Sequence, residues 1–280
     1  MSGFQPEWLK LRAAADARAR DKTLLKRLSE RFAGRDTIKV VDLGAGLGSN
    51  LRATAPALPA HQRWTLIDHD PVLLAGACEA IAAWADKAQA TADGVEAMKE
   101  NRHIHVTLKR ADLAADPAAW GENADLITAA ALFDLVSAQW IDRFVAALKR
   151  ARLPLYAALT HDGVTEWNPP HPADRAMHAA FEHHFARDKG FGPSAGGKAS
   201  GLLVERLKAA GYEVERAASP WRLGAADAAL IVATAEGWAA AVRETAEVPA
   251  TTITEWLAAR KTRSIACIVG HEDLIAFPAG

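Results

Sequence analysis

Residues 40–50 read Val-Val-Asp-Leu-Gly-Ala-Gly-Leu-Gly-Ser-Asn, and this stretch decides the fold. The valines end an apolar run that begins at Ile38, which is typical of a buried parallel strand. Glycines at positions 44, 46 and 48 let the backbone turn tightly and approach a ligand, because no Cβ stands in the way. A helix that starts after the turn offers unpaired N–H groups. The segment therefore predicts a strand, a glycine-rich turn and a helix that together hold a nucleotide-like ligand.

The spacing of these glycines separates two classes of ligand. A dinucleotide fold uses G-x-G-x-x-G, with its backbone packed against a pyrophosphate. Here the third glycine comes one residue early, and Ser49 stands where that pattern needs glycine. The carboxylate of Asp42, two positions before Gly44, suits a cationic ligand better than a pyrophosphate. A nicotinamide-dependent oxidoreductase and a purely structural turn remain as alternatives.

The composition describes an ordinary globular chain. Its 280 residues are 50% hydrophobic, enough for one large α/β domain or a domain with a small cap. The net charge of −1 comes without a basic stripe, so we expect no nucleic-acid partner. The two cysteines, Cys78 and Cys267, lack metal-site spacing and indicate a reducing compartment. No signal peptide and no membrane span is expected, which makes the cytoplasm the predicted location.

Acidic residues follow the next two predicted strands. The apolar residues 64–67 end at Asp68, which lies 20 residues after Gly48 (68 − 48) and can accept both hydroxyls of a ribose. A helix opens at Pro71 and runs through residue 84. Residues 104–110 alternate as a strand would and lead to Asp112, whose carboxylate could bind an adenine amino group or cap a turn. Before that strand, residues 87–101 are polar and predict a loop or short helix.

The remaining strands and helices complete an alternating pattern. Strands are expected at residues 124–130, 153–160 and 212–218, and a last strand at residues 264–275. Apolar residues at helical spacing from Trp140 to Leu148 indicate a core helix, and helices are also expected at 202–210, 225–245 and 253–260. Strand–helix alternation of this kind predicts a parallel, doubly wound sheet.

Two insertions and an N-terminal segment extend this sheet within one domain, residues 1–280. Residues 1–33 predict a helical lid, which could carry Arg12, Asp16 or Arg20 to a ligand. Residues 34–160 form the expected cofactor-binding core, residues 161–200 a cap insertion, and residues 224–263 a helical insertion before the last strand. Trp238 and Trp256 in the second insertion are expected to pack in a core.

The Asp42–Gly48 run, with Asp68 and Asp112 after the second and third strands, resembles the pattern of class I S-adenosylmethionine-dependent methyltransferases. The resemblance covers residues 38–220, and the later segments 219–223 and 269–271 are similar to uncharacterised bacterial methyltransferases. It implies a doubly wound, mostly parallel, seven-stranded Rossmann-like sheet with helical cap insertions. It also implies S-adenosyl-L-methionine as the cofactor and S-adenosyl-L-homocysteine as the product.

The same resemblance implies which residues hold the cofactor. The glycine turn would lie against its methionine part, Asp68 on the ribose hydroxyls, and Asp112 with Leu113 near the adenine. Asp42 would support the loop near the cofactor's amino group. The full set of expected cofactor-binding residues is Asp42, Gly44, Ala45, Gly46, Gly48, Asn50, Asp68, His69, Asp112, Leu113 and Ala130.

The acceptor side is expected at the carboxyl ends of strands four and five. Methyl transfer needs a base only when the acceptor must lose a proton, and histidine is the side chain best suited near neutral pH. His161, directly after strand five, is the first candidate, with Asp134 as a second catalytic residue. Expected acceptor contacts are Phe133, His171, His178 and Lys189. No metal is expected, although His178 and Glu182 are one helical turn apart.

These residues predict a methyltransferase for a small-molecule acceptor, with oxygen as the expected atom. The segment 130–134 reads Ala-Ala-Leu-Phe-Asp and lacks the Asp/Asn-Pro-Pro-Tyr motif of amino-group methylases. A cofactor-binding protein without transfer activity is a further alternative, as is a methylase of nucleic acid or protein. A homodimer is compatible with the insertion at 224–263.

Overall fold

The computed structural model describes residues 5–121, 123–263 and 266–279, and their strands form one ten-stranded sheet. The strands within these residues are β1 (Thr37–Leu43), β2 (His61–Asp68), β3 (Lys87–Ala90), β4 (Gly94–Lys99), β5 (Arg102–Arg110), β6 (Leu126–Ala130), β7 (Leu155–Asn168), β8 (Tyr212–Ala218), β9 (Trp221–Leu223) and β10 (Ala266–Pro278). The α-helices are α1 (Pro6–Ala19), α2 (Lys22–Phe32), α3 (Ser49–Thr54), α4 (Pro71–Trp84), α5 (Ala138–Ala151), α6 (Asp174–Phe185), α7 (Ala199–Ala209), α8 (Ala228–Thr245) and α9 (Ala250–Arg263).

The sheet confirms the doubly wound fold. Its order is β3-β4-β5-β2-β1-β6-β7-β10-β8, with β9 paired to β10. Strands β5, β2, β1, β6 and β7 are parallel, and β10 runs antiparallel between β7 and β8. All seven expected strands are present, although residues 264–265 of the last one lie outside the described part. The N-terminal segment forms two helices, α1 and α2.

One expected element was wrong. Residues 87–101, predicted as a loop or short helix, form the antiparallel hairpin β3–β4, which extends the sheet beyond β5. Buried Val95 and Ala97 alternate with exposed Glu96, and Gly94 begins the second strand. The alternation spans so few residues, among so many polar ones, that the sequence pattern did not reveal it.

Two apolar cores lie on the two faces of the sheet. On one face, α2 and α4 pack against strand residues such as Trp64 and Val106. On the other, α5 and α7 pack through Trp140, Phe144 and Leu203. The predicted core role of Trp140 through Leu148 is therefore confirmed.

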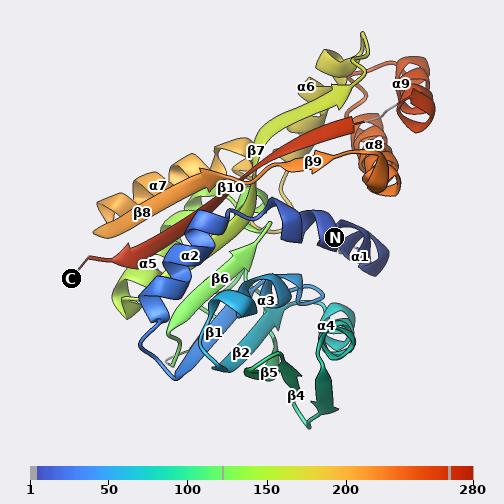
Figure 1. The fold of residues 1–280 in the computed structure, drawn as a ribbon. Coiled ribbons are helices and arrows are strands. Elements are labelled where there is room, and N and C mark those ends of the chain that lie inside the picture. The colour runs from blue at the N-terminus through green and yellow to red at the C-terminus, as the bar shows by residue number, and fades with distance from the viewer. Residues whose placement is uncertain (1–4, 122, 264–265, 280) are drawn as a thin grey trace.

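A third core belongs to a cap at the carboxyl edge of the sheet. Strand β7 was expected to end at residue 160 but continues to Asn168, and β10 runs beside it. Helices α6, α8 and α9 gather around the far ends of these two strands (Figure 1). Trp167, Trp238 and Trp256 are buried there, so the expected core packing of the two insertion tryptophans is confirmed.

A buried cation joins the helices of this cap. The guanidinium of Arg260 on α9 lies 5.3 Å from the ring centre of Trp167 and 5.2 Å from that of Trp256. It also pairs with Asp174 at the start of α6. The indole Nε1 of Trp256 donates to Asp174 Oδ1 at 2.7 Å. Hydrogen-bonded charge and aromatic packing thus hold α6, α9 and β7 together.

One segment of the cap, Ala225–Thr245, is long and apolar enough to cross a membrane by length and composition. The sequence was expected to contain no such segment. In the structure Leu230, Ile231, Trp238 and Val242 of this segment are buried in the cap core. Core helices of globular proteins pass the same test, so this packing accounts for its apolar character.

The cap should depend on Trp256, which is fully buried. We expect Trp256→Ala to lower the free energy of unfolding by about 3–5 kcal/mol, because it leaves a cavity and removes the bond to Asp174. Denaturant unfolding monitored by circular dichroism measures the change. Val72→Ala, at a largely exposed position of α4, is the matched control and should change stability by less than about 0.5 kcal/mol. A loss below about 1 kcal/mol for Trp256→Ala would contradict this account of the cap.

Candidate functional site

The glycine turn follows β1 at the carboxyl edge of the sheet. Gly44, Gly46 and Gly48 have φ values of +65°, +52° and +68°, a region that favours glycine. A Cβ added at Gly46 would lie 3.3 Å from Leu9 Cδ1 of α1, so the N-terminal helix packs directly on the loop. Figure 1 shows α1 between the cap and α3, which begins at Ser49. Leu9 of α1 therefore packs against the glycine turn, and the lid role of residues 1–33 stays a prediction.

Asp42 lies fully buried beneath this loop. Its Oδ1 accepts hydrogen bonds from Asn50 Nδ2 at 2.5 Å and from Thr128 Oγ1 at 2.9 Å. Its Oδ2 has no hydrogen-bond partner among the described residues. Burial raises the pKa of Asp42 to about 6, against the opposing effect of the bonds from Asn50 and Thr128. A charged Asp42 would thus be stabilised by a nearby cation.

Asp68 connects the end of β2 to the glycine turn. Its Oδ2 accepts a hydrogen bond from the Gly46 N–H at 2.9 Å, and its Oδ1 accepts one from the Asp70 N–H at 3.0 Å. The His69 ring lies beside it, with Nδ1 3.3 Å from Asp68 Oδ1. An ionised carboxylate can accept about four hydrogen bonds, so two protein donors leave capacity for ligand hydroxyls.

The residues expected near the adenine have other contacts. Asp112 is exposed, and its Oδ1 accepts a hydrogen bond from the Ala114 N–H at 2.9 Å, which is the turn cap that the sequence left open. Leu113 is buried, and its carbonyl accepts from Trp140 Nε1 at 2.6 Å. Ala130 ends β6 at the carboxyl edge. The adenine role of Asp112 and Leu113 stays a prediction.

A bulge in β7 shapes the acceptor side. The β7–β10 register shifts between Glu272 and Leu274, and Leu159 has a φ of +56° although it is not glycine. Its N–H donates to the buried carboxylate of Asp273 at 2.9 Å. A bulge bends its strand, and strain of this kind clusters at functional sites. It lies two residues before His161.

His161 is fixed by β10 on one side and α6 on the other. Its Nδ1 lies 3.0 Å from the carbonyl oxygen of Gly270, at a second register shift of β10, so a protonated Nδ1 donates to that oxygen. Its Nε2 lies 3.8 Å from Oε1 of Glu182 on α6. Burial lowers the pKa of His161, but Glu182, Asp134 and the Gly270 carbonyl together raise it above its ordinary value.

Asp134 belongs to the same buried group. It lies in the short 3-10 helix Phe133–Leu135 after β6. Burial raises the pKa of its carboxyl, while nearby His161 and Arg12 oppose that rise. Within the described chain, Asp134 Oδ1, His161 Nε2 and Glu182 Oε1 are all buried without a hydrogen bond. Such atoms are rare and costly in folded proteins, so their gathering marks a candidate ligand site.

Sequence patterns missed two members of this region. Glu182 was noted only for its spacing from His178, and only the packing of α6 on β7 brings it to His161. His271 on β10 pairs with His161 in the strand register. Burial, together with nearby Arg12 and His161, holds the pKa of His271 well below its ordinary value. Its ring lies 5.1 Å from that of Trp221.

The lid contacts the same region through Trp221. The indole Nε1 of Trp221 donates to Asp16 Oδ1 at 2.9 Å, and the guanidinium of Arg12 lies 4.9 Å from the indole centre. Arg12 also binds Asp16 at 2.9 Å. Arg20, by contrast, is buried against Tyr156 of β7, with Nη1 donating to its hydroxyl at 3.4 Å. Arg12 thus acts on the acceptor side, near Asp134 and His271, whereas the charge of Arg20 acts on Asp42 beneath the glycine turn.

The four expected acceptor contacts have mainly structural partners. Phe133 is 1% exposed and packs edge-on against Phe144 and Trp140, so it belongs to the core rather than to a binding surface. His171 Nδ1 accepts from the Ala173 N–H at 3.1 Å, just before α6. His178 Nε2 lies 2.9 Å from the Gly163 carbonyl oxygen, and the Lys189 ammonium lies 4.5 Å from the centre of the Phe185 ring.

Comparison with known proteins places the fold. No protein-family model and no curated protein matches the chain. A provisionally named methyltransferase from Bacillus halodurans C-125 is 15% identical, with a TM-score of 0.50, covering 92% of this chain and 100% of that one. The YcgJ protein from Bacillus subtilis is 13% identical, with the same TM-score of 0.50, covering 93% of this chain and 100% of that one. The chain therefore shares its mostly parallel α/β fold with these structures, one of which is named as a methyltransferase.

The burial of Asp42 predicts a measurable effect of pH on stability. Since its pKa is about 6 in the folded protein and about 4 when unfolded, the folded state holds more protons between these values. The free energy of unfolding therefore falls as the pH rises from about 4 to 6, and it stays lower above pH 6. Asp42→Asn keeps an oxygen for Asn50 and Thr128, and should raise the free energy of unfolding at pH 7 by about 1–3 kcal/mol.

Urea unfolding of wild type and Asp42→Asn at pH 4.5 and 7 measures this effect. The advantage of the variant should shrink at the lower pH. Asp42→Ala, which loses both hydrogen bonds, is the control and should destabilise the protein by about 1–3 kcal/mol. Equal stability of wild type and Asp42→Asn at pH 7 would show that the carboxylate is not penalised by burial.

Proposed function

We propose that this protein is an S-adenosylmethionine-dependent methyltransferase that methylates an oxygen of a small molecule. The hydrogen bond between Asp68 and the Gly46 N–H carries the proposal, because it brings the acidic end of β2 and the glycine turn to one point of the carboxyl edge. In open α/β sheets, ligands bind outside the carboxyl ends of the strands.

The residues at this edge fit the cofactor. Asp68 has capacity to accept the ribose hydroxyls, and the Gly46 turn offers close approach of the backbone. The buried, unpaired Oδ2 of Asp42 suits a ligand that carries an ammonium group nearby. Leu9 of α1 covers Gly46, so we expect α1 to move when the cofactor binds. When bound, the cofactor supplies a methyl group that its sulfonium charge already activates.

His161 would act as the base. With Nδ1–H donating to Gly270, its Nε2 holds the free electron pair and can take the proton of an acceptor hydroxyl. Glu182 lies beyond this nitrogen and acts as a positioning residue, since its charge favours the imidazolium that forms. Asp134 Oδ1 would accept a hydrogen bond from the acceptor and align its oxygen.

Burial of the site supports a small acceptor. His161 is 8% exposed and Asp134 is 6% exposed, and both lie where the cap meets the sheet. Side chains buried in this way are shielded from water, which favours a small acceptor over a macromolecule. In this proposal the enzyme is cytoplasmic. Residues 1–33 act as a lid over the site, and residues 161–200 and 224–263 form its cap. A homodimer would be compatible with it.

Calorimetry with S-adenosylmethionine and S-adenosylhomocysteine tests the cofactor. We expect micromolar binding to wild type and at least about tenfold weaker binding to Asp68→Ala, because two charge-assisted hydrogen bonds are lost. Asp116→Ala, which removes an exposed carboxylate that also caps a turn, should leave binding unchanged. Binding of NAD or NADP instead would favour the oxidoreductase alternative.

The role of His161 as the base can be tested from the pH dependence of the methyl-transfer rate. We expect His161→Ala to lower kcat about 10²- to 10⁴-fold on a panel of phenols, carboxylic acids and alcohols, without weakening cofactor binding. Since neutral His161 is the active form, kcat/KM should rise with pH through the raised pKa of His161. Glu182→Gln should move that rise to lower pH. The imidazole titration of His161, followed by NMR, should move to lower pH in the same variant. His184→Gln, on the same helix, is the control.

Two results would count against this mechanism. An unchanged imidazole titration in Glu182→Gln would remove Glu182 from the site. Intact cofactor binding without turnover of any acceptor would favour a cofactor-binding protein that transfers no methyl group.

A further inference from the structure

One face of the sheet is uncovered at its amino edge. In parallel α/β sheets the crossover helices normally cover both faces. Between β5 and β6, however, the described residues of the connection, 111–121 and 123–125, form turns and no helix. Exposed polar residues of β1, β2 and β5 therefore point to solvent on this face, while their neighbours Val40, Trp64 and Val106 point into the core.

The strand register arranges these residues in rows. Lys39 of β1 lies beside Arg63 of β2, which lies beside His105 of β5, and Glu96 of β4 ends the row. Adjacent strands are about 4.8 Å apart, so three basic side chains stand next to one another. A second row places His61 beside His103, with their rings stacked at 5.2 Å.

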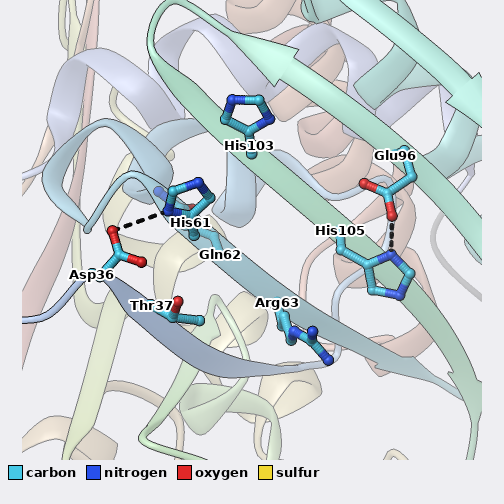
Figure 2. Close-up of a pocket in the computed structure, with 8 residues that line it drawn as sticks. All are labelled: Asp36, Thr37, His61, Gln62, Arg63, Glu96, His103 and His105. Atoms are coloured by element: carbon cyan, nitrogen blue, oxygen red, sulfur yellow. Dashed lines mark hydrogen bonds and ion pairs between the residues drawn. The ribbon is translucent and has the colours of Figure 1, made fainter.

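The acidic side chains around the rows already have hydrogen-bond partners. Asp36 lies 3.2 Å from His61 Nδ1, and Glu96 lies 2.6 Å from His105 Nδ1 (Figure 2). Asp125 bonds Arg35 and the Lys39 backbone N–H. Asp93, one row further along, bonds Thr91 and Thr107.

Two adjacent cations remain without an anion. The side chains of Lys39 and Arg63 have no hydrogen bond or ion pair to any described residue. Like charges directly opposite on neighbouring strands destabilise a sheet. An anionic ligand would reverse that effect, because it would pair with both side chains at once.

The surface is hollowed at this place. A hollow of about 460 Å³ is lined by Arg63, Thr37, the three histidines His61, His103 and His105, and the acidic residues Asp36 and Glu96, as Figure 2 shows. A second hollow of about 370 Å³ adjoins it, shares Arg63 and His105, and adds Lys39, Thr65 and Trp120. Each has the size of a small-molecule site.

The donors match a phosphate-bearing ligand. Arg63 offers a planar fork of N–H donors and Lys39 a compact charge, the two side chains that proteins use for phosphate oxygens. Hydroxyls of Thr37 and Thr65 and the ring of His103 add neutral donors in the same hollows. We propose that this uncovered face binds a polyphosphate-type anion, either free or as part of a nucleotide.

This site is separate from the proposed methyl-transfer site. Strand β2 begins at His61 in the hollow and ends at Asp68 on the carboxyl edge. The five residue steps from Arg63 to Asp68, each about 3.3 Å, put roughly 17 Å between the proposed anion contact and the cofactor edge. Occupation of one site therefore leaves the residues of the other free.

Calorimetry with sodium tripolyphosphate and with ATP tests the proposal on the whole protein. We expect both to bind, with Arg63→Gln and Lys39→Gln each weakening binding about 5- to 20-fold. Glu96→Gln should strengthen binding about 2- to 5-fold, because it removes the negative charge that ends the row. Arg222→Gln, an exposed arginine on cap strand β9, is the matched control and should change nothing.

The outcomes separate the possible ligands. Equal affinity for the two probes would assign recognition to the phosphates alone, and tighter binding of ATP would assign it to a nucleotide. Absence of binding, or equal weakening by Arg222→Gln, would overturn the proposal. S-adenosylhomocysteine affinity should be the same in Arg63→Gln and wild type, which keeps this test independent of the proposed function.

Discussion

The pairing of β7 with β10 is the constraint on which the rest of the structure depends. Both strands continue past the carboxyl edge of the sheet, so the same two strands serve the core and the cap. The buried carboxylate of Asp273 holds the bulge in β7 by accepting from the Leu159 N–H and the Tyr156 hydroxyl. It also accepts from the Asp21 N–H, between the lid helix and α2. The sheet and the N-terminal helices thus meet at one carboxylate, two residues from His161 in the strand register.

The candidate site contains buried polar atoms that lower the stability of the folded protein. Folded proteins pair almost all buried polar atoms, yet Asp42 Oδ2, Asp134 Oδ1 and His161 Nε2 are buried and without partners in the described chain. Elsewhere in the cap the Trp256 indole and Nη1 of Arg260 are hydrogen-bonded, while Trp167 Nε1 and Arg260 Nε are also buried without a partner in the described chain. Unsatisfied polar groups that gather at one edge of a sheet are better explained by a ligand than by faulty packing.

Local sequence patterns predicted the glycine turn and the strands beside it, but not the hairpin β3–β4 of the same half. The apolar run before Gly44 and the acidic end of the strand at Asp68 each depend on a few adjacent residues, and the structure brings them together through one hydrogen bond. The acceptor half depends on long-range geometry. Glu182 approaches His161 only because β7 continues past residue 160 and carries the cap, and no periodicity within residues 161–168 announced that strand. Phe133 was expected to contact the acceptor because it follows β6, but in the short 3-10 helix Phe133–Leu135 its side chain packs in the core.

The central claim is that the carboxyl edge around Gly46 and Asp68 holds the cofactor. A crystal structure of the protein with S-adenosylhomocysteine tests it most directly. The account predicts ribose hydroxyls on the carboxylate of Asp68, the amino group of the ligand toward Asp42, and Leu9 displaced from the glycine turn. Ligand density elsewhere, or a glycine turn still covered by Leu9 at saturating ligand, would contradict it.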